Sequence, residues 1–283
     1  MVGASGQVGH CVVNELTKRG LEAVGTYNTR PREAFVQLQL NDEKQIDALI
    51  FDLMPDVVFF CASLTHVDYC ESHPSDSYVV NVKGARLVAQ ATERVGGKFV
   101  FLSTDYVFNG RAGPYVETDS PAPINVFGTH KLPIESLAID CLSAALVART
   151  TWVYSYERPE PGKNFVQRLV ASLSKHETVR VPNDQFGNPT YAPDLAERLV
   201  ITALDGASGL VHLAGQNLLS RYEFACHIAK CFRLDEKYIM SVSTSELNQA
   251  ARRPLKAGLR SIRTISLPGY DSGLSRMIAE SKL

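Results

Sequence analysis

The stretch NVFGTHKL, residues 125–132, sets an aromatic ring and a lysine amine four positions apart. On a helix, positions i and i+4 share a face, so Phe127 and Lys131 should point at one site. Ketone reduction needs an acid for the carbonyl oxygen. A tyrosine can serve when a nearby ammonium lowers its pKa and a hydroxyl orients the oxygen. Because Phe127 has no phenol, the pattern indicates a ketone-reducing site that lacks its usual acid.

The glycine-rich start of the chain is the second feature with chemical content. The stretch VGASGQVGH has glycines at positions 3, 6 and 9 and leads directly into a helical pattern. Such a loop turns tightly, lets the backbone approach a pyrophosphate and aims a helix N-terminus at its negative charge. The pattern predicts a dinucleotide site that comprises Gly3, Ser5, Gly6, Gln7, Val8 and Gly9.

The residues that end the second expected strand favour NADP over NAD. They read YNTRPR, residues 27–32, with two guanidinium groups and no carboxylate. A carboxylate there would accept hydrogen bonds from the ribose 2′-hydroxyl of NAD, whereas Arg30, beside Asn28 and Thr29, could hold a 2′-phosphate. In the alternative interpretation, both arginines are solvated loop residues.

Short apolar runs alternate with helical patterns, which is typical of a parallel sheet covered by helices. The clearest strands are expected over Glu22–Tyr27, Asp56–Ser63, Lys98–Thr104 and Ala145–Thr150. The helices between them are expected over Val8–Arg19, Glu43–Asp52, Ser77–Val95 and Phe127–Ile139. The fold class is therefore α/β, a Rossmann-type doubly wound parallel sheet.

Only Met1 and Val2 precede Gly3, although a nucleotide-binding unit needs a strand before its glycine loop. That strand is normally central, and without it the neighbouring strands would keep unpaired backbone groups. We therefore expect the polypeptide to have residues upstream of Met1.

The pattern loosens beyond residue 150. The stretch PNDQFGNPTY, residues 182–191, is turn chemistry, and a strand over 209–215 and a helix over 221–232 follow it. We expect an NADP-binding domain over residues 1–150. Residues 151–283 should form mainly a small substrate lobe, with segments that return to the main domain.

The composition fits an ordinary globular protein. The chain has 283 residues, 45% of them hydrophobic and 21% charged, and a formal charge of −1, which gives no reason to expect nucleic acid or a membrane surface as a partner. No apolar run approaches the roughly 20 residues of a transmembrane helix, and no signal peptide is evident. Six scattered cysteines favour reduced thiols in a cytoplasmic protein and no metal site.

Four stretches carry a resemblance to a known family. They are ASLTHVDYCE (62–71), STDYVFNG (103–110), PAPINVFGTHKLPIE (121–135) and DQFGNPT (184–190). Together they resemble the extended short-chain dehydrogenases, and within them the dTDP-4-dehydrorhamnose reductase family. This resemblance implies a Rossmann-type NADP domain, a small nucleotide-sugar lobe and reduction of a 4-keto sugar. A methionine adenosyltransferase β regulatory subunit resembles the same family.

The resemblance assigns roles at the expected centre. Thr104 matches the hydroxyl that orients the carbonyl, and Lys131 matches the lysine that also holds the nicotinamide ribose. Phe127 stands where the family has its catalytic tyrosine. Nucleotide-sugar dehydratases carry an Asp-Glu pair after the threonine. Because Asp105 is followed here by Tyr106, dehydration is not expected.

The resemblance also implies contacts outside this centre. Cys61, Ala62 and Ser63 should border the adenosine side of the cofactor, Asn81 the catalytic region, and Gln39 with Leu40 the adenine. The residues implied to face the substrate are Thr104, Asp105, Tyr106, Asn164, Gln185, Pro189, Thr190 and Arg253. For Gln185 and Thr190 a structural turn is the alternative, and for Arg253 solvation is.

Two hypotheses about activity remain open. In the first, the chain is an NADP-dependent reductase of a nucleotide-linked 4-keto deoxysugar, with Tyr106 as a substitute acid if the strand through Thr104 continues that far. His130 is expected to face elsewhere because it lies about 100° round the helix from Lys131. In the second, Phe127 makes the chain a silent NADP-binding module. The residues do not determine which sugar the protein binds, or whether it forms a homodimer or binds a regulatory protein.

Overall fold

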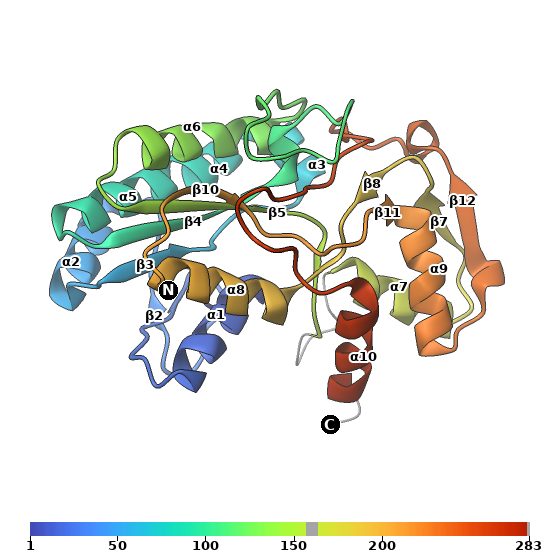
Figure 1. The fold of residues 1–283 in the computed structure, drawn as a ribbon, viewed down its shortest axis with the longest axis horizontal. Coiled ribbons are helices and arrows are strands. Elements are labelled where there is room, and N and C mark those ends of the chain that lie inside the picture. Colours follow the sequence, from blue (N-terminus) through green and yellow to red (C-terminus); the bar gives the residue numbers. More distant parts are fainter. Residues whose placement is uncertain (157–163, 282–283) are drawn as a thin grey trace.

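The computed structural model describes residues 1–156 and 164–281. Its largest sheet lies between two layers of helices, and a smaller lobe lies at one end of it (Figure 1). This sheet has the strand order β10-β5-β4-β3, and all neighbours are parallel. Its strands are β3 (Val57–Phe60), β4 (Lys98–Thr104), β5 (Ala145–Thr150) and β10 (Gly209–His212). The expected α/β, Rossmann-type fold is thereby confirmed.

Met1 and Val2 extend this sheet beyond β3. Val2 forms a parallel bridge with Phe60. On the other side of Val2 lies the parallel pair β1 (Thr26–Tyr27) and β2 (Val36–Gln37). Thr26, the first residue of β1, donates its N–H to the Met1 carbonyl at 2.9 Å. Met1 and Val2 thus link β3 to β1 through a single bridge and backbone hydrogen bonds, directly before the glycine loop. The expectation of residues upstream of Met1 stays a prediction.

The strand expected over Glu22–Tyr27 is shorter in the structure, which assigns only β1. Met1 and Val2 offer a short partner, and the Met1 amine donates to the Val24 carbonyl at 2.7 Å where that partner begins. The residues before Val24 therefore have no neighbouring strand to pair with, so the sequence-based range was wrong in extent.

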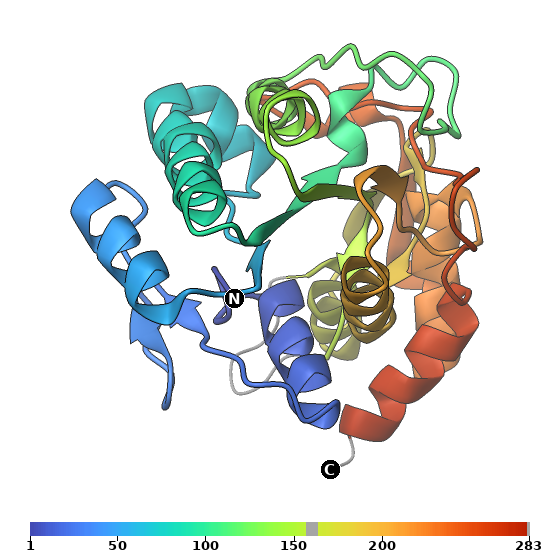
Figure 2. The same cartoon turned by 60° about the vertical axis from the view of Figure 1, so that its left-hand side comes forward.

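Helices cover both faces of the main sheet (Figure 2). One face carries α2 (Glu43–Leu53), α5 (Ala85–Arg94) and α6 (Val126–Asp140), and the other carries α1 (Gln7–Lys18) and α8 (Ala192–Leu204). Alternate residues of the central strands supply the two apolar layers: Phe99, Phe101 and Val147 enter the first, and Val100, Leu146 and Ala148 enter the second. Burial on both faces explains why these strands are continuously apolar.

The helix expected over Ser77–Val95 is interrupted. The structure has α3 (Val67–Ser72) and α4 (Pro74–Tyr78), then a π-helical turn η1 (Val79–Gly84), and only then α5. Gly84 lies against Leu40, where a Cβ would come within 2.6 Å of the Leu40 Cβ. Periodicity alone does not reveal such a widened turn, which occurs often at functional sites.

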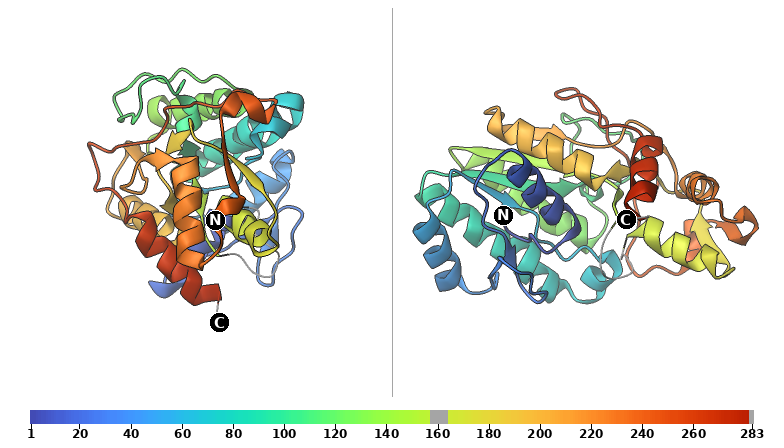
Figure 3. Two further views of the ribbon diagram at one scale, coloured as in Figure 1. Left: turned by 90° about the vertical axis from the view of Figure 1, so that its right-hand side faces the viewer. Right: turned by 90° about the horizontal axis from the view of Figure 1, so that it is seen from below.

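The C-terminal part of the chain forms a lobe with its own apolar core (Figure 3). Its helices are α7 (Phe165–Ser174), α9 (Arg221–Phe232) and α10 (Tyr270–Ser281). Its strands are β6 (Val153–Tyr154), β7 (Val179–Pro182), β8 (Phe186–Gly187), β9 (Thr190–Tyr191), β11 (Leu219–Ser220) and β12 (Ile239–Val242). The 3₁₀ turns η3 (Glu236–Tyr238) and η4 (Thr244–Leu247) border it.

Two segments of this later part belong to the main layers. β10 pairs with β5 at the edge of the sheet, and α8 packs against α1 on its second face. None of the helices in residues 1–156 and 164–281 has the length and apolarity that a bilayer crossing requires.

Candidate functional site

The centre of the candidate site lies where β4 ends beside the first turns of α6. After Thr104 the chain turns into η2 (Asp105–Val107), and Gly128 of α6 packs directly on that turn. A Cβ at Gly128 would lie 2.0 Å from the Tyr106 carbonyl oxygen, so only glycine permits this approach. The close contact brings Thr104, Phe127 and Lys131 together.

Two residues that the sequence analysis missed fix the start of α6. Asn125 caps the helix: its Oδ1 accepts the Gly128 N–H at 2.9 Å, and its Nδ2 donates to the Arg252 carbonyl at 2.9 Å. Glu71 accepts the N–H of Val126 at 2.9 Å. The asparagine before a helical pattern was a readable capping signal. The role of Glu71 depends on a tertiary contact that sequence spacing does not show.

Lys131 is buried, and two aromatic rings lie close to its amine. Its Nζ donates to the Leu102 carbonyl at 3.2 Å and lies 4.7 Å from the ring centroid of Phe101 and 5.8 Å from that of Phe127. Burial lowers the pKa of the ammonium to about 8, against the smaller opposing influence of the Cys61 thiol. An amine in this position can give or take a proton near neutral pH.

This burial predicts that Lys131→Met stabilises the fold at neutral pH. The folded pKa, about 8, lies below the ordinary 10.5, so the unfolded chain binds more protons between these values and stability rises with pH across that window. At pH 7 the buried ammonium destabilises the fold by its full amount. From the difference between the two pKa values, we expect Lys131→Met to raise the free energy of unfolding by about 3 kcal/mol.

Urea unfolding at pH 7 and pH 9.5 measures this effect. The gap between Lys131→Met and the wild type should narrow at the higher pH. Lys83→Met, at an exposed lysine, should change little at either pH. A Lys131→Met protein less stable than wild type at pH 7 would show that the ammonium holds the fold together.

Tyr106 and Phe127 touch edge to face. Their ring centroids are 5.9 Å apart with an interplanar angle of 73°. β4 ends at Thr104, so the condition under which the sequence placed Tyr106 on the same face as Thr104 is not met. Instead Thr104 Oγ1 accepts the Tyr106 N–H at 3.2 Å and starts the 3₁₀ turn, which swings the phenol toward α6. Burial raises the pKa of Tyr106, and the guanidinium groups of Arg253 and Arg221 oppose that rise.

Asp105 is buried beside these groups. It accepts the Thr151 hydroxyl at 2.7 Å and the Thr104 hydroxyl at 3.2 Å. Burial raises the pKa of its carboxyl to about 6. Asp105 therefore holds the Thr104 side chain in place, and it lies deeper than the substrate-facing role implied for it.

His130 faces away from the centre, as expected. Its ring lies 2.9 Å from the Ser77 hydroxyl and packs edge-on against Tyr78. Both contacts belong to α4, so His130 supplies no proton to the group around Thr104.

The glycine loop has a shape that fits a pyrophosphate. Gly3 has φ 84°, and a Cβ there would lie 2.7 Å from the Ala62 nitrogen. A Cβ at Gly9 would lie 2.2 Å from the Gly3 carbonyl oxygen, whereas one at Gly6 would meet only that oxygen, at 3.3 Å. Gly3 and Gly9 thus close the loop, and Gly6 leaves its outer side open. No side chain caps α1 at Gly6, so first-turn N–H groups stay available to an anion.

The neighbours of the loop occupy defined places. Gln7 donates to the Ser155 hydroxyl at 2.9 Å and so ties α1 to the lobe. Ser5 on the loop and Val8 in the first turn of α1 are half-buried. Cys61 donates its N–H to the Val2 carbonyl at 3.0 Å, which keeps the residues after β3 against the loop.

Asn81 organises the turn after β3. It lies buried in η1, where its Oδ1 accepts the Ser63 hydroxyl at 2.8 Å and the Leu64 N–H at 2.9 Å. Its Nδ2 donates to the Leu64 carbonyl at 3.0 Å and to the Ser77 hydroxyl at 3.1 Å. The amide of Asn81 and the hydroxyl of Ser63 are therefore used within the protein, and both act on the site through the position of this turn.

The residues expected at the adenosine end lie at the surface. Asn28, Thr29 and Arg30 are exposed, while Arg32 is half-buried with Nη1 3.5 Å from His10 Nδ1 on α1. The geometry thus places Arg32 nearer to the glycine loop helix than the sequence indicated. The desolvation of His10 lowers its pKa, and the nearby Arg32 lowers it further.

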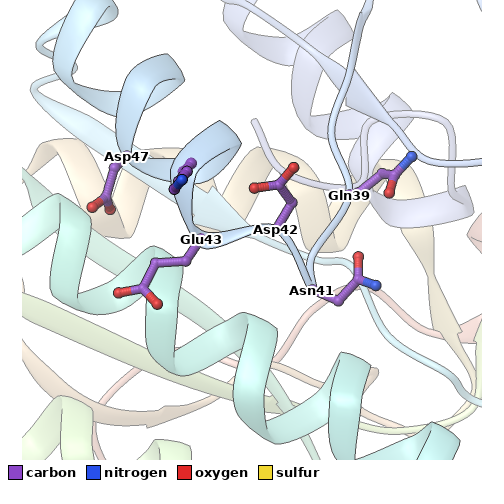
Figure 4. A pocket seen from close by; sticks show the side chains of 6 residues that line it. Gln39, Asn41, Asp42, Glu43 and Asp47 are labelled. Carbon is purple, nitrogen blue, oxygen red and sulfur yellow. The ribbon is translucent and has the colours of Figure 1, made fainter.

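Gln39 and Leu40 follow β2. Leu40 is buried, and the Gln39 N–H donates to Gln45 Oε1 at 2.8 Å. Gln39 is one of the residues that line a surface pocket of about 610 Å³ at the amino end of α2 (Figure 4). This pocket is lined by Gln39, Asn41, Asp42, Glu43, Lys44 and Asp47. It lies outside the group around Thr104.

Most expected substrate residues of the lobe are committed to internal bonds. Asn164 caps α7 and donates to the Ser155 carbonyl at 2.9 Å. Gln185 donates to Thr244 at 3.0 Å, and Thr190 is fully buried with its hydroxyl on the Asn188 carbonyl. Pro189, next to Thr190, is buried too. The structure does not bring these side chains to the centre.

Arg253 also has internal partners, but it differs from the other expected substrate residues because its charge acts on Tyr106 at the centre. It forms an ion pair with Asp68 at 2.7 Å and donates to the Ala251 carbonyl at 2.8 Å. It also raises the positive potential at Tyr106. Residues 1–156 and 164–281 contain no group of three or more His, Cys, Asp or Glu side chains arranged to hold a metal.

The sheet, the glycine loop and the lysine beside β4 define a Rossmann-type protein of the extended short-chain dehydrogenase class. A family model described as the RmlD substrate binding domain matches residues 1–282. The chain belongs to this family, which confirms the resemblance drawn from its motifs.

Individual relatives agree with the family. The chain is 34% identical to the dTDP-4-dehydrorhamnose reductase of Burkholderia thailandensis, with 92% of this chain and 89% of that protein covered. It is 29% identical to the methionine adenosyltransferase 2 subunit beta of Bos taurus, with 92% and 79% covered. A crystal structure of the Bacillus anthracis dTDP-4-dehydrorhamnose reductase in complex with NADP superimposes with a TM-score of 0.89, at 29% identity over 99% of this chain and 97% of that one.

Proposed function

We propose that the protein is an NADP-dependent reductase of a nucleotide-linked 4-keto deoxysugar. The observation that carries the proposal is the buried Lys131, whose amine bonds to the Leu102 carbonyl of β4, the strand that ends at Thr104, in a chain with an open glycine loop. The family and the NADP complex of the Bacillus anthracis relative support the cofactor, and the Burkholderia thailandensis relative supports the substrate class.

Each group then has one task. When bound, the nicotinamide would supply the hydride. The loop from Gly3 to Gly9 would hold the pyrophosphate, with Arg30 or Arg32 on the 2′-phosphate and Lys131 on the ribose hydroxyls. Thr104 would orient the carbonyl oxygen. Tyr106 would give its phenolic proton to that oxygen, because Phe127 has none to give.

A second candidate is a cofactor-binding module without turnover, regulatory or structural. Phe127 favours it, since the ring beside Lys131 carries no hydroxyl. The whole-chain similarity to a methionine adenosyltransferase 2 subunit beta supports it as well. The same fold and the same glycine loop would serve both functions.

The test is oxidation of NADPH with dTDP-4-dehydrorhamnose by the wild type and by Tyr106→Phe. If Tyr106 is the acid, the variant should lose about 10²–10⁴-fold in kcat, the usual contribution of a general acid. NADPH titration by fluorescence should give the same affinity for both proteins, because Tyr106 lies on the substrate side. Wild-type turnover that survives in Tyr106→Phe would exclude this acid, and no turnover in either protein would favour the silent module.

A further inference from the structure

Arg221 is a partly buried cation that packs on two aromatic rings. Its guanidinium carbon lies 4.0 Å from the ring centroid of Trp152 and 4.9 Å from that of Phe165. In residues 1–156 and 164–281, no ion pair joins Arg221 to a carboxylate, whereas the shielded Arg149 and Arg253 each hold one. A cation that loses water without gaining an acid is costly, so the aromatic contacts only partly explain its placement.

The surroundings of Arg221 are built to hold it still. Trp152 has φ 43°, a left-handed conformation that is strained for an aromatic residue, and such strain concentrates at binding sites. Gly187 packs closely on its indole, where a Cβ would lie 2.4 Å from Trp152 Cε2. The backbone N–H of Arg221 donates to the Gln185 carbonyl at 2.9 Å. The side chain therefore has a fixed base and a fixed aromatic platform.

The guanidinium belongs to the substrate side of the centre. Burial lowers the pKa of the Arg221 guanidinium, Tyr106 and Asp105 oppose this, and Arg168 and Arg253 add to it. Thr151, the chain neighbour of Trp152, donates to Asp105 at 2.7 Å, which sets the Trp152 ring beside the centre. Asp105 already accepts two hydroxyls, so it offers little to Arg221. Arg221 also opens α9, where the positive end of the helix dipole disfavours a cation. The guanidinium groups of Arg221 and Arg253 and the N-terminus of α9 thus add positive potential around Tyr106, against the carboxylates of Asp105 and Asp68.

We propose that Arg221 binds an oxyanion of the substrate next to the carbonyl that is reduced. The oxyanion is a phosphate of the nucleotide or, if the sugar is oxidised at C6 instead of deoxygenated there, a sugar carboxylate, since a guanidinium fork pairs with both. This inference rests on the proposed function for the kind of substrate, and it adds the residue that recognises the charge.

Binding of two probes tests the inference. By calorimetry, Arg221→Met should bind dTDP about ten- to a hundredfold more weakly than wild type, the usual cost of losing a hydrogen-bonded charge contact. Thymidine, which has no phosphate, should bind both proteins alike. Galacturonate tests the other source of the oxyanion in the same way. Lys230→Met, at an exposed position on the same helix, should behave like wild type throughout.

Thermal unfolding separates binding from structure. Because Arg221 forms no ion pair within residues 1–156 and 164–281, Arg221→Met should unfold at the same temperature as wild type or higher. A variant that binds dTDP and galacturonate as wild type does would overturn the inference. So would a variant that loses stability and NADPH affinity together with dTDP affinity. Dependence of dTDP binding on Arg221 in a protein that fails to oxidise NADPH would remove the reductase proposal and keep this one.

Discussion

Phe127→Tyr is expected to raise kcat for NADPH-dependent reduction, by up to about 10²–10⁴-fold if the wild type has no general acid and by less if Tyr106 already donates the proton. Phe127 is only 6% exposed, and its ring centroid lies 5.8 Å from Lys131 Nζ on the same side of α6. A hydroxyl on that ring would sit near the ammonium, which stabilises a phenolate, and near the carbonyl that Thr104 orients. Steady-state rates with dTDP-4-dehydrorhamnose measure the gain, and KM should change much less than kcat because the substrate contacts remain.

The double variant Phe127→Tyr, Tyr106→Phe is the matched control. With a phenol restored at position 127, loss of the Tyr106 hydroxyl should cost far less than it does in the wild type. Activity that appears only after Phe127→Tyr would identify the wild type as a silent module. A rate unchanged by the substitution would mean that the proton reaches the oxygen by another route, and the proposed geometry of the centre would be wrong.

Glu135→Leu is expected to lower the free energy of unfolding by about 3–5 kcal/mol. Glu135 accepts Arg149 Nη2 at 2.6 Å and Nε at 3.0 Å, and it also accepts the Ser103 hydroxyl. Both charged side chains are at most 4% exposed. Removal of the carboxylate leaves a buried guanidinium whose other contacts are the His212 ring at 3.5 Å and the face of Phe108. Urea unfolding measures the loss.

Two further variants show whether the loss of stability in Glu135→Leu comes from the unpaired buried charge. Glu135→Leu combined with Arg149→Met removes both charges and should recover most of the stability, since apolar residues often replace a buried ion pair at little cost. Asp47→Leu removes the surface ion pair with Arg94 and should change stability by no more than about 1 kcal/mol. If Glu135→Leu and Asp47→Leu lowered the free energy of unfolding equally, burial would not make the Glu135–Arg149 pair more important for stability than the surface pair.

The elements with continuous apolar content were well predicted from the sequence. β4 and β5 have the expected bounds, and so does α9, because burial on both faces or a capping serine leaves a clear pattern. The adjacency of Phe127 and Lys131 followed from helical spacing alone, and the contacts of both with one aromatic cluster agree with it.

Features that depend on long-range contacts were not readable. The widened turn around Asn81 follows from packing on the segment after β3, and no periodicity marks it. Thr190 looked like a substrate residue in a turn, but its hydroxyl serves the backbone of its own loop. Arg221 looked like any polar residue at a helix start. Its one signal was a cation where the helix dipole disfavours it, and its meaning depends on Trp152, about seventy residues away.

The strand order has a consequence for synthesis on the ribosome. β10 closes the sheet beside β5 and α8 covers α1, yet both segments are translated after much of the lobe. Until β10 and α8 leave the ribosome, the backbone groups at one edge of β5 are unpaired and one apolar face of the nascent sheet is exposed to solvent. At about 5–20 residues per second this interval lasts seconds, long enough for a holdase chaperone to engage the chain. The cofactor-binding half should therefore become protease-resistant only after residue 212 has left the exit tunnel.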